Sequence, residues 1–230
     1  MRNILKNTAL GLPKLSVLCA LLIPVAAMAA PFTNGGFESP GIPAGSQVPI
    51  GPGFNEPTGW VAGGTASPGS FSLFYQHAIW FPGDNSVGFG GNGTTGASIS
   101  QTFDTIAGQS YTVNYQATQQ QGISPQSFLV EAFNGASLIA SVSFSVPAYG
   151  AGETFHFFNG TPLIFNAVSG STTLTFLDTT TLANSGPSNF AIDNVSVNGV
   201  VGAVPEPETY ALLLGGLALV GAMARRPKSA

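Results

Sequence analysis

Aromatic and polar side chains gather in one short segment, FSLFYQHAIWFPGDN, at residues 71–85. Tyr75, His77 and Trp80 offer rings, and Asp84 offers hydrogen-bonding oxygens a few residues later. Proteins bind sugars with this combination, because a ring stacks on the apolar face of the sugar while polar groups bind its hydroxyls. We therefore name Trp80, Tyr75, His77 and Asp84 as candidate ligand-binding residues. The alternative is that Tyr75 and Trp80 belong to the hydrophobic core.

The ionisable residues are divided unevenly along the chain. All 6 Lys and Arg residues lie near the two ends, and none lies between residues 30 and 203. That stretch carries carboxylates only: Glu38, Glu56, Asp84, Asp104, Glu131, Glu153, Asp178 and Asp193. Nucleic acids are excluded as partners and anionic substrates are disfavoured, because neutralising their charge requires Lys or Arg. A carboxylate buried in this stretch would need a bound cation, and calcium is the cation we expect.

Motifs of the common hydrolases are missing. Residues 96–100 read GASIS, which fails the G-x-S-x-G pattern at its last position, and neither H-E-x-x-H nor a phosphate-binding glycine loop occurs. Glycosidases can pair carboxylates that are distant in sequence, so a glycan-active hydrolase stays as an alternative. We predict that the protein is not an enzyme.

Short strands must position these side chains. Val, Ile, Phe, Tyr and Thr alternate with polar residues in runs separated by Gly, Asn and Pro, a pattern typical of half-buried strands. We expect Trp60 and the phenylalanines of these strands in the core, and loop-like structure over 33–60 and 61–69. The expected strands are 97–104, 111–118, 126–133, 138–146, 153–158, 162–168, 172–177 and 190–197. Many short strands without helices predict an all-β fold, an antiparallel sandwich of the jelly-roll kind.

The N-terminal residues 1–29 have the composition of a secretory signal peptide. Arg2, Lys6 and Lys14 precede an apolar run, and an A-x-A cleavage site ends at Ala29. We expect a signal helix that is removed on export, the alternative being an uncleaved anchor. Cys19, the chain's single cysteine, lies within it, so the mature chain would have no disulfide.

The C-terminal segment combines an apolar run with basic residues. Residues 210–224 would form a helix about 22 Å long, short of a bilayer core of about 30 Å. Arg225 and Arg226 begin a basic tail, 225–230, that we expect on the cytoplasmic side. A tether, 201–209, joins this weak transmembrane helix to the body, 30–200.

Val204, Pro205, Glu206 and Pro207, the apolar run, and then Arg225 and Arg226 together resemble the PEP-CTERM sorting signal of Gram-negative bacteria. The resemblance implies recognition by an exosortase-type membrane enzyme and inner-membrane transit to the cell envelope or extracellular matrix, often beside exopolysaccharide production. The alternative is a plain membrane tail.

Two further motifs lie at the ends of the body: NGGFE at residues 34–38 and FAIDNVSV at residues 190–197. With residues 99–117 between them, they resemble the galactose-binding-like jelly rolls of carbohydrate-binding modules. That resemblance implies a structural calcium joining the first and last strands, held here by Glu38 and Asp193. The alternative is that both carboxylates are exposed, or that Asp193 only accepts from nearby backbone N–H groups.

These observations predict an exported, non-catalytic sandwich that contacts extracellular polysaccharide. A purely structural surface protein is the second reading.

Overall fold

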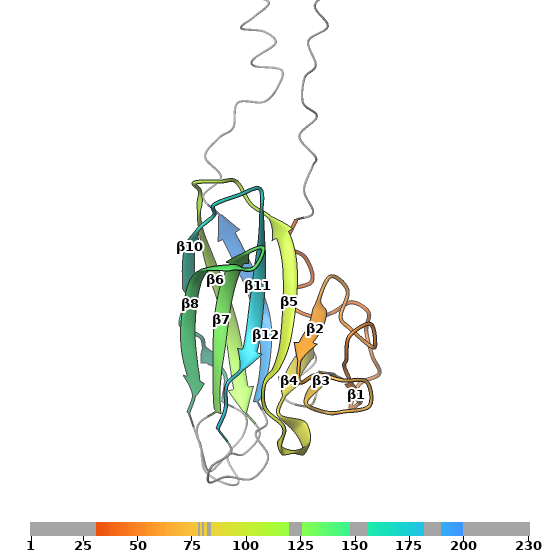
Figure 1. The fold of residues 1–230 in the computed structure, drawn as a ribbon. Helices are drawn as coiled ribbons and strands as arrows, with labels where there is room; N and C mark the ends of the chain where they lie inside the picture. Colours follow the sequence, from red (N-terminus) through yellow and green to blue (C-terminus); the bar gives the residue numbers. More distant parts are fainter. Residues whose placement is uncertain are drawn as a thin grey trace, which may run out of the picture.

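The computed structural model describes residues 31–77, 79, 81, 84–119, 126–147, 156–181 and 190–199. They form two antiparallel β-sheets that face each other (Figure 1). The all-β, antiparallel sandwich expected from the sequence is therefore confirmed. The signal helix and the C-terminal transmembrane helix fall outside the described residues. Within the described ranges, no helix has the length and apolar character needed to cross a membrane.

Both sheets are built entirely from antiparallel pairs. The larger sheet has the order β1 (Gln47–Pro49), β3 (Leu73–His77), β4 (Asn85–Phe89), β12 (Phe190–Gly199), β6 (Ser110–Gln119) and β10 (Leu163–Asn166), with β9 (Phe158–Asn159) also pairing with β6. The smaller sheet has the order β2 (Val61–Gly64), β5 (Ala97–Asp104), β11 (Ser171–Asp178), β7 (Gln126–Asn134) and β8 (Ser137–Val146). A single 3-10 turn, Gly91–Gly93, is the helical structure found in the described residues.

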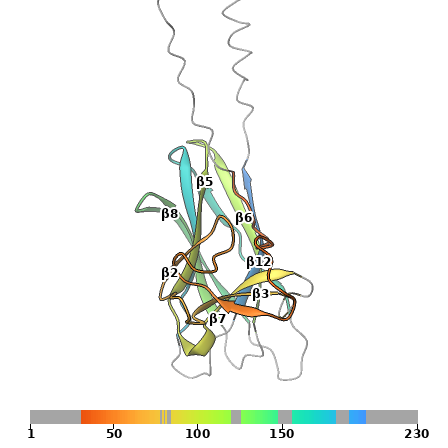
Figure 2. The same cartoon turned by 90° about the vertical axis from the view of Figure 1, so that its right-hand side faces the viewer.

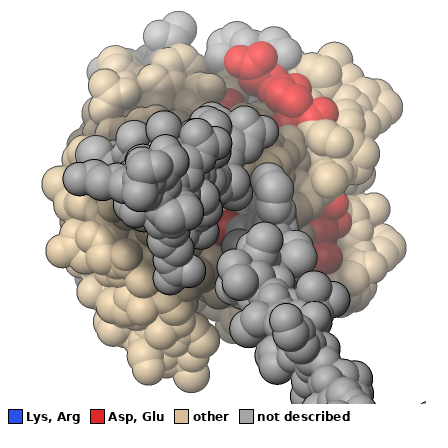
Figure 3. Space-filling view, turned by 90° about the horizontal axis from the view of Figure 1, so that it is seen from above, with Lys and Arg blue, Asp and Glu red and all other residues tan. Residues whose placement is uncertain are grey.

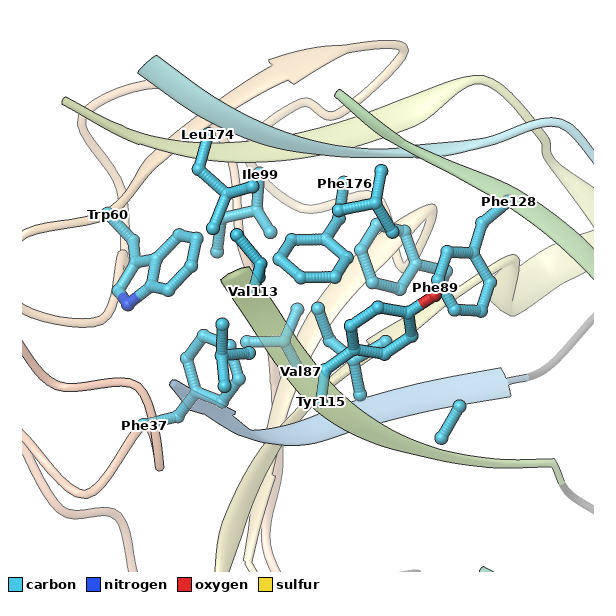
Figure 4. Close-up of a cluster of buried hydrophobic side chains, with 14 of the residues drawn as sticks. Phe37, Trp60, Val87, Phe89, Ile99, Val113, Tyr115, Phe128, Leu174 and Phe176 are labelled. Carbon is cyan, nitrogen blue, oxygen red and sulfur yellow. The ribbon is translucent and has the colours of Figure 1, made fainter. Parts of the chain in front are cut away.

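Alternation along the long strands builds the core. In β5, Ile99 and Phe103 point inward and are buried, while Thr102 between them is exposed. Figure 4 shows the resulting aromatic cluster, in which Trp60 and Tyr115 pack beside Phe176. Trp60 is 2% exposed, so its predicted core position is confirmed.

Two parts of the N-terminal half were predicted wrongly. The segments expected to be loop-like contain the short strands β1 and β2. The last two residues of β2 are Gly63 and Gly64. No strand was predicted at β3 or β4. These two strands are buried on both faces, because Phe74 and Phe81 pack with Ala191 on the side away from the main core. A strand buried on both faces has no period-two signal to detect.

The first turn of the body packs directly on the last strand. The amide of Val195 donates to the carbonyl of Gly35 (2.9 Å), and a Cβ at Gly35 would lie 1.8 Å from the Val195 carbonyl oxygen. Only glycine permits this approach. Figure 2 turns this N-terminal segment, coloured red to orange, toward the viewer. The contact brings the residues that follow Gly35 to the side of β12.

Candidate functional site

A β-bulge in β12 creates the most unusual polar site in the described part of the chain. The register between β12 and β6 shifts between Asp193 and Ser196, and Asn194 takes a left-handed backbone conformation with φ 53°. As a result, Asp193 is 1% exposed, whereas Asn194 is exposed. The bulge therefore places two successive side chains in different environments, one buried and one exposed to solvent.

Asp193 lies near Glu38, the carboxylate with which we expect it to share a cation. Gly36 separates them: a Cβ on Gly36 would be 3.9 Å from the Asp193 Oδ1 and 3.9 Å from the Glu38 Cγ. The Glu38 side chain is exposed, but both of its carboxylate oxygens accept hydrogen bonds from Asn85, at 2.9 Å from the backbone N–H and 2.6 Å from Nδ2. The first turn, β4 and β12 thus converge on this junction.

Two buried oxygens at the junction have no hydrogen-bond donor. Asn194 N–H donates to Asp193 Oδ1 (2.6 Å), which leaves Asp193 Oδ2 without a partner. Asn85 Oδ1 is also buried and without a partner. Buried polar atoms are paired in most proteins, so two orphaned oxygens on residues that both interact with Glu38 call for an explanation.

The electrostatics of the junction also indicate that a positive partner is missing. Burial, and then the charges of Asp84 and Glu38, raise the pKa of Asp193 to about 8, although the hydrogen bond from Asn194 opposes the change. Burial and the same cluster of negative charge, Glu38 and Asp193, raise the pKa of Tyr75 to about 12. A carboxylate whose charged form is this disfavoured lacks a positive partner.

The junction suits a hard cation better than a soft one. Its donors are carboxylate and amide oxygens, which calcium prefers, and no thiol or imidazole contributes. Within the described residues, no cluster of three His, Cys, Asp or Glu side chains could hold a metal. A cation bound by Glu38 and Asp193 would therefore need amide or backbone oxygens as further ligands, and Asn85 Oδ1 is one such oxygen.

A second site, the amide groove, lies on the face of the larger sheet away from the core. It has a volume of about 600 Å³. Its lining contains no charged side chain: Asn114, Tyr115, Gln116, Asn159, Gly160, Pro162 and Asn194. The strands β6, β9 and β12 bring its four amides together, and only Asn194 of these stands in a sequence motif, at residues 190–197.

The amides of the groove form a chain across three strands. Asn194 Nδ2 donates to Gln116 Oε1 (2.9 Å), and Gln116 Nε2 donates to Asn159 Oδ1 (3.3 Å). The chain leaves the Asn159 Nδ2 as a donor at one end and the Asn194 Oδ1 as an acceptor at the other. These are the two capacities that a sugar hydroxyl needs from its binding site.

The candidate ligand-binding residues of the sequence are placed apart from this groove. Tyr75 is 1% exposed, and its hydroxyl donates to the Pro40 carbonyl (2.6 Å) and lies against that of Phe37, so its ring presents no face to a ligand. His77 Nδ1 bonds to the Ile42 carbonyl (2.6 Å), and Asp84 is exposed beside the acidic junction. Trp80 lies outside the described residues.

The acidic side chains have no basic counterpart on the body. Figure 3 shows carboxylates at the surface and no Lys or Arg among the described residues on the face in view. The amide groove is therefore a neutral hollow in a body of negative charge.

Comparison with known proteins identifies the C-terminus and the fold. Residues 203–227 match the family described as the PEP-CTERM protein-sorting motif. No curated protein matches the chain.

Solved structures with similar folds include two proteins from Fischerella sp. TAU. One is a Stig cyclase in complex with a pyrrolidinylidene-indole, with 17% identity, 74% of this chain and 96% of that chain covered, and a TM-score of 0.51. The other is a cyclase in complex with 4-(1H-indol-3-yl)butan-2-one, with 16% identity, 75% and 98% covered, and a TM-score of 0.50.

A carbohydrate-binding module in complex with β-1,4-galactotriose is also similar, with 15% identity, 73% of this chain and 96% of that chain covered, and a TM-score of 0.47. These similarities are to β-sandwich folds. The sorting residues Val204, Pro205, Glu206, Pro207, Arg225 and Arg226 all lie within the matched segment. The chain therefore carries a PEP-CTERM protein-sorting motif, which marks an exported protein that is processed at the membrane.

Proposed function

We propose that this protein is sorted by an exosortase-type enzyme to the cell envelope or extracellular matrix, where its sandwich binds neutral polysaccharide without catalysis. The observation that carries the proposal is the amide groove, which combines hydroxyl-binding groups with a complete lack of charge. The PEP-CTERM motif supports the extracellular location, where polysaccharide is abundant.

The charge of the body selects among polysaccharides. Residues 30–203 contain 8 carboxylates and no Lys or Arg. A uronic acid polymer would approach this surface against like charge and would find no cation in the groove lining. A neutral polymer would meet uncharged groups throughout: the four amides, Tyr115, Gly160 and Pro162. We therefore expect selectivity for neutral chains.

The test is a binding assay on the exported protein. Neutral gluco-, galacto- and manno-oligosaccharides are compared with uronic acid oligomers of equal length, with calcium present. The variant Gln116→Ala/Asn159→Ala breaks the amide chain and should lower affinity for the neutral ligand at least tenfold. Asn166→Ala removes an exposed amide on β10 outside the groove and should leave affinity unchanged. Equal binding by all three proteins would refute the groove as the site.

We also propose a structural calcium at the junction of Glu38 and Asp193. Two orphaned buried oxygens and the absence of any basic partner support it. Asp193 and Glu38 would hold the ion, and Asn85, which already donates to Glu38, would offer its unpaired Oδ1. When bound, calcium would supply the positive charge that the Asp193 carboxylate lacks, so the N-terminal turn would be tied to β12.

A glycan hydrolase remains the competing function. A carboxylate of raised pKa beside other carboxylates is typical of acid catalysts. Asp193 argues against this role, because a side chain that is 1% exposed has no room to protonate a glycosidic oxygen. Release of reducing ends from a bound polysaccharide would overturn the non-catalytic proposal.

A further inference from the structure

Strand β8 ends the smaller sheet, pairs with β7 alone among the described strands and packs beside β10 of the larger sheet. Hydrogen bonds within the described residues join β8 to β7, and β8 has no other strand partner there. β8 lies at the outer side of the sandwich in both views (Figure 1 and Figure 2). About half of its 10 residues direct their backbone N–H and C=O groups away from β7.

Most edge strands are protected, and β8 has few of the usual devices. Natural sheets block their edges with Lys, Pro, charged side chains, β-bulges or very short strands. β8 has one of these features, a register shift against β7 at Ile139, and residues 140–146 lie beyond it. The sequence of β8, SLIASVSFSV, contains no charge, no Pro and no Gly. A ten-residue strand is about 34 Å long, which is enough for a full ladder with a second strand.

We propose that β8 pairs antiparallel with β8 of a second copy of this chain, which joins two smaller sheets into one continuous sheet. Centring a two-fold axis on Val142 places Ser141 opposite the partner copy's position 143 and Ala140 opposite position 144. Inward residues then face inward residues. The small Ala140 meets the large Phe144, and Val142 meets its own copy, so the half-buried apolar side chains of both edges become covered. Such self-complementarity is what a two-fold interface requires.

The distribution of charge favours contact between two copies at the β8 edge over contact at the rest of the surface. Two copies of a body with 8 carboxylates and no basic residue repel each other over most approaches. β8 and β10, which lie on the same side of the sandwich, carry no charge. A carboxylate on the neighbouring strand, Glu131 of β7, lies opposite Ser141. Its distance to Glu131 of the second copy spans at least three strand spacings, about 14 Å, which exceeds the screening length of about 8 Å at physiological salt.

The test compares oligomeric states of the full chain in mild detergent by sedimentation. The unaltered chain should be a dimer at tens of micromolar. Ser141→Lys/Ser143→Lys places four like charges across the proposed ladder and should give a monomer with unchanged melting temperature. Thr102→Lys/Ser171→Lys adds the same charge to exposed positions on the same face of the sheet and should remain dimeric. A monomeric unaltered chain, or a dimeric β8 variant, would overturn the proposal. The shared C-terminal segment cannot explain a difference between the two variants.

Cross-linking tests the register independently. In a Cys19→Ser background, Ser141→Cys/Ser143→Cys should form a dimer held by two disulfides under oxidation, because directly opposite Cβ atoms lie about 5 Å apart. Thr102→Cys/Ser171→Cys should not cross-link. Cross-linking of both pairs, or of neither, would count against the proposed pairing.

Discussion

Replacing Asp193 with Asn separates the calcium site from a merely buried carboxylate. Asn keeps the Oδ1 that accepts from the Asn194 N–H, at 2.6 Å in the unaltered protein, but it carries no charge. Burial raises the folded-state pKa of Asp193 to about 8, so in the metal-free protein stability falls as pH rises from about 4 to about 8. Asp193→Asn removes this loss, so at pH 8 the metal-free variant should be more stable than the unaltered protein by a few kcal/mol.

Calcium should stabilise the unaltered protein and narrow that difference. An ion at 100 times its dissociation constant stabilises the folded state by about 2.7 kcal/mol. For a domain of this size, that raises the melting temperature by about 5–10 °C. Asp193→Asn should lose this gain, because half of the carboxylate charge at the junction is gone.

The assay is thermal unfolding followed by near-UV circular dichroism, at pH 8, with calcium and with chelator. Glu131→Gln makes the same chemical change on the outer face of β7 and should keep the full calcium response. An unaltered protein whose melting temperature ignores calcium would refute the site. A variant that gains as much from calcium as the unaltered protein would show that Asp193 is not a ligand.

Two further changes test the sandwich itself. Gly160→Ala would place a Cβ 1.9 Å from Cε2 of Tyr115, so it should lower the unfolding free energy by about 1–3 kcal/mol, whereas Gly170→Ala enters open space and should have little effect; urea unfolding measures both. Burial raises the pKa of Asp178 to about 6, above its unfolded value, so its contribution to stability is greatest below pH 4 and is lost as pH rises to 6. In chelator, Asp178→Asn should remove about 3 kcal/mol of the stability that the unaltered protein loses between about pH 4 and pH 6. An unchanged pH dependence of the unfolding free energy would contradict the raised pKa of Asp178.

Strand prediction from sequence worked where one face of a strand meets water. β5 and β6 show the alternation that their burial requires, so their residues could be assigned from the sequence pattern alone. β3 and β4 gave no such signal, because Phe74 and Phe81 cover the face that would otherwise be polar. The aromatic segment 71–85, which we expected to bind sugar, supplies Phe74 and Phe81 to the small apolar cluster that covers this face.

The acidic junction and the amide groove differ in how much of each could be predicted from the sequence. Glu38 and Asp193 stand in motifs at the two ends of the body, and the structure places both beside Gly36. The amide groove as a whole has no motif, since Gln116 and Asn159 meet Asn194 of the 190–197 motif only through strand register. Amides are common surface residues, so only their convergence on one hollow distinguishes them.

The bulge in β12 connects the two sites through consecutive residues. Asp193 turns its carboxylate into the acidic junction, and Asn194 turns its amide into the groove, where it donates to Gln116. At the bulge, the Asn194 N–H donates to the Asp193 carboxylate, whose charge is disfavoured without a cation. Protonation of that carboxylate weakens this hydrogen bond, and a bound calcium would keep the carboxylate charged. Chelation should therefore lower polysaccharide affinity even though no calcium ligand touches the groove, and Asp193→Asn should make the remaining affinity independent of calcium.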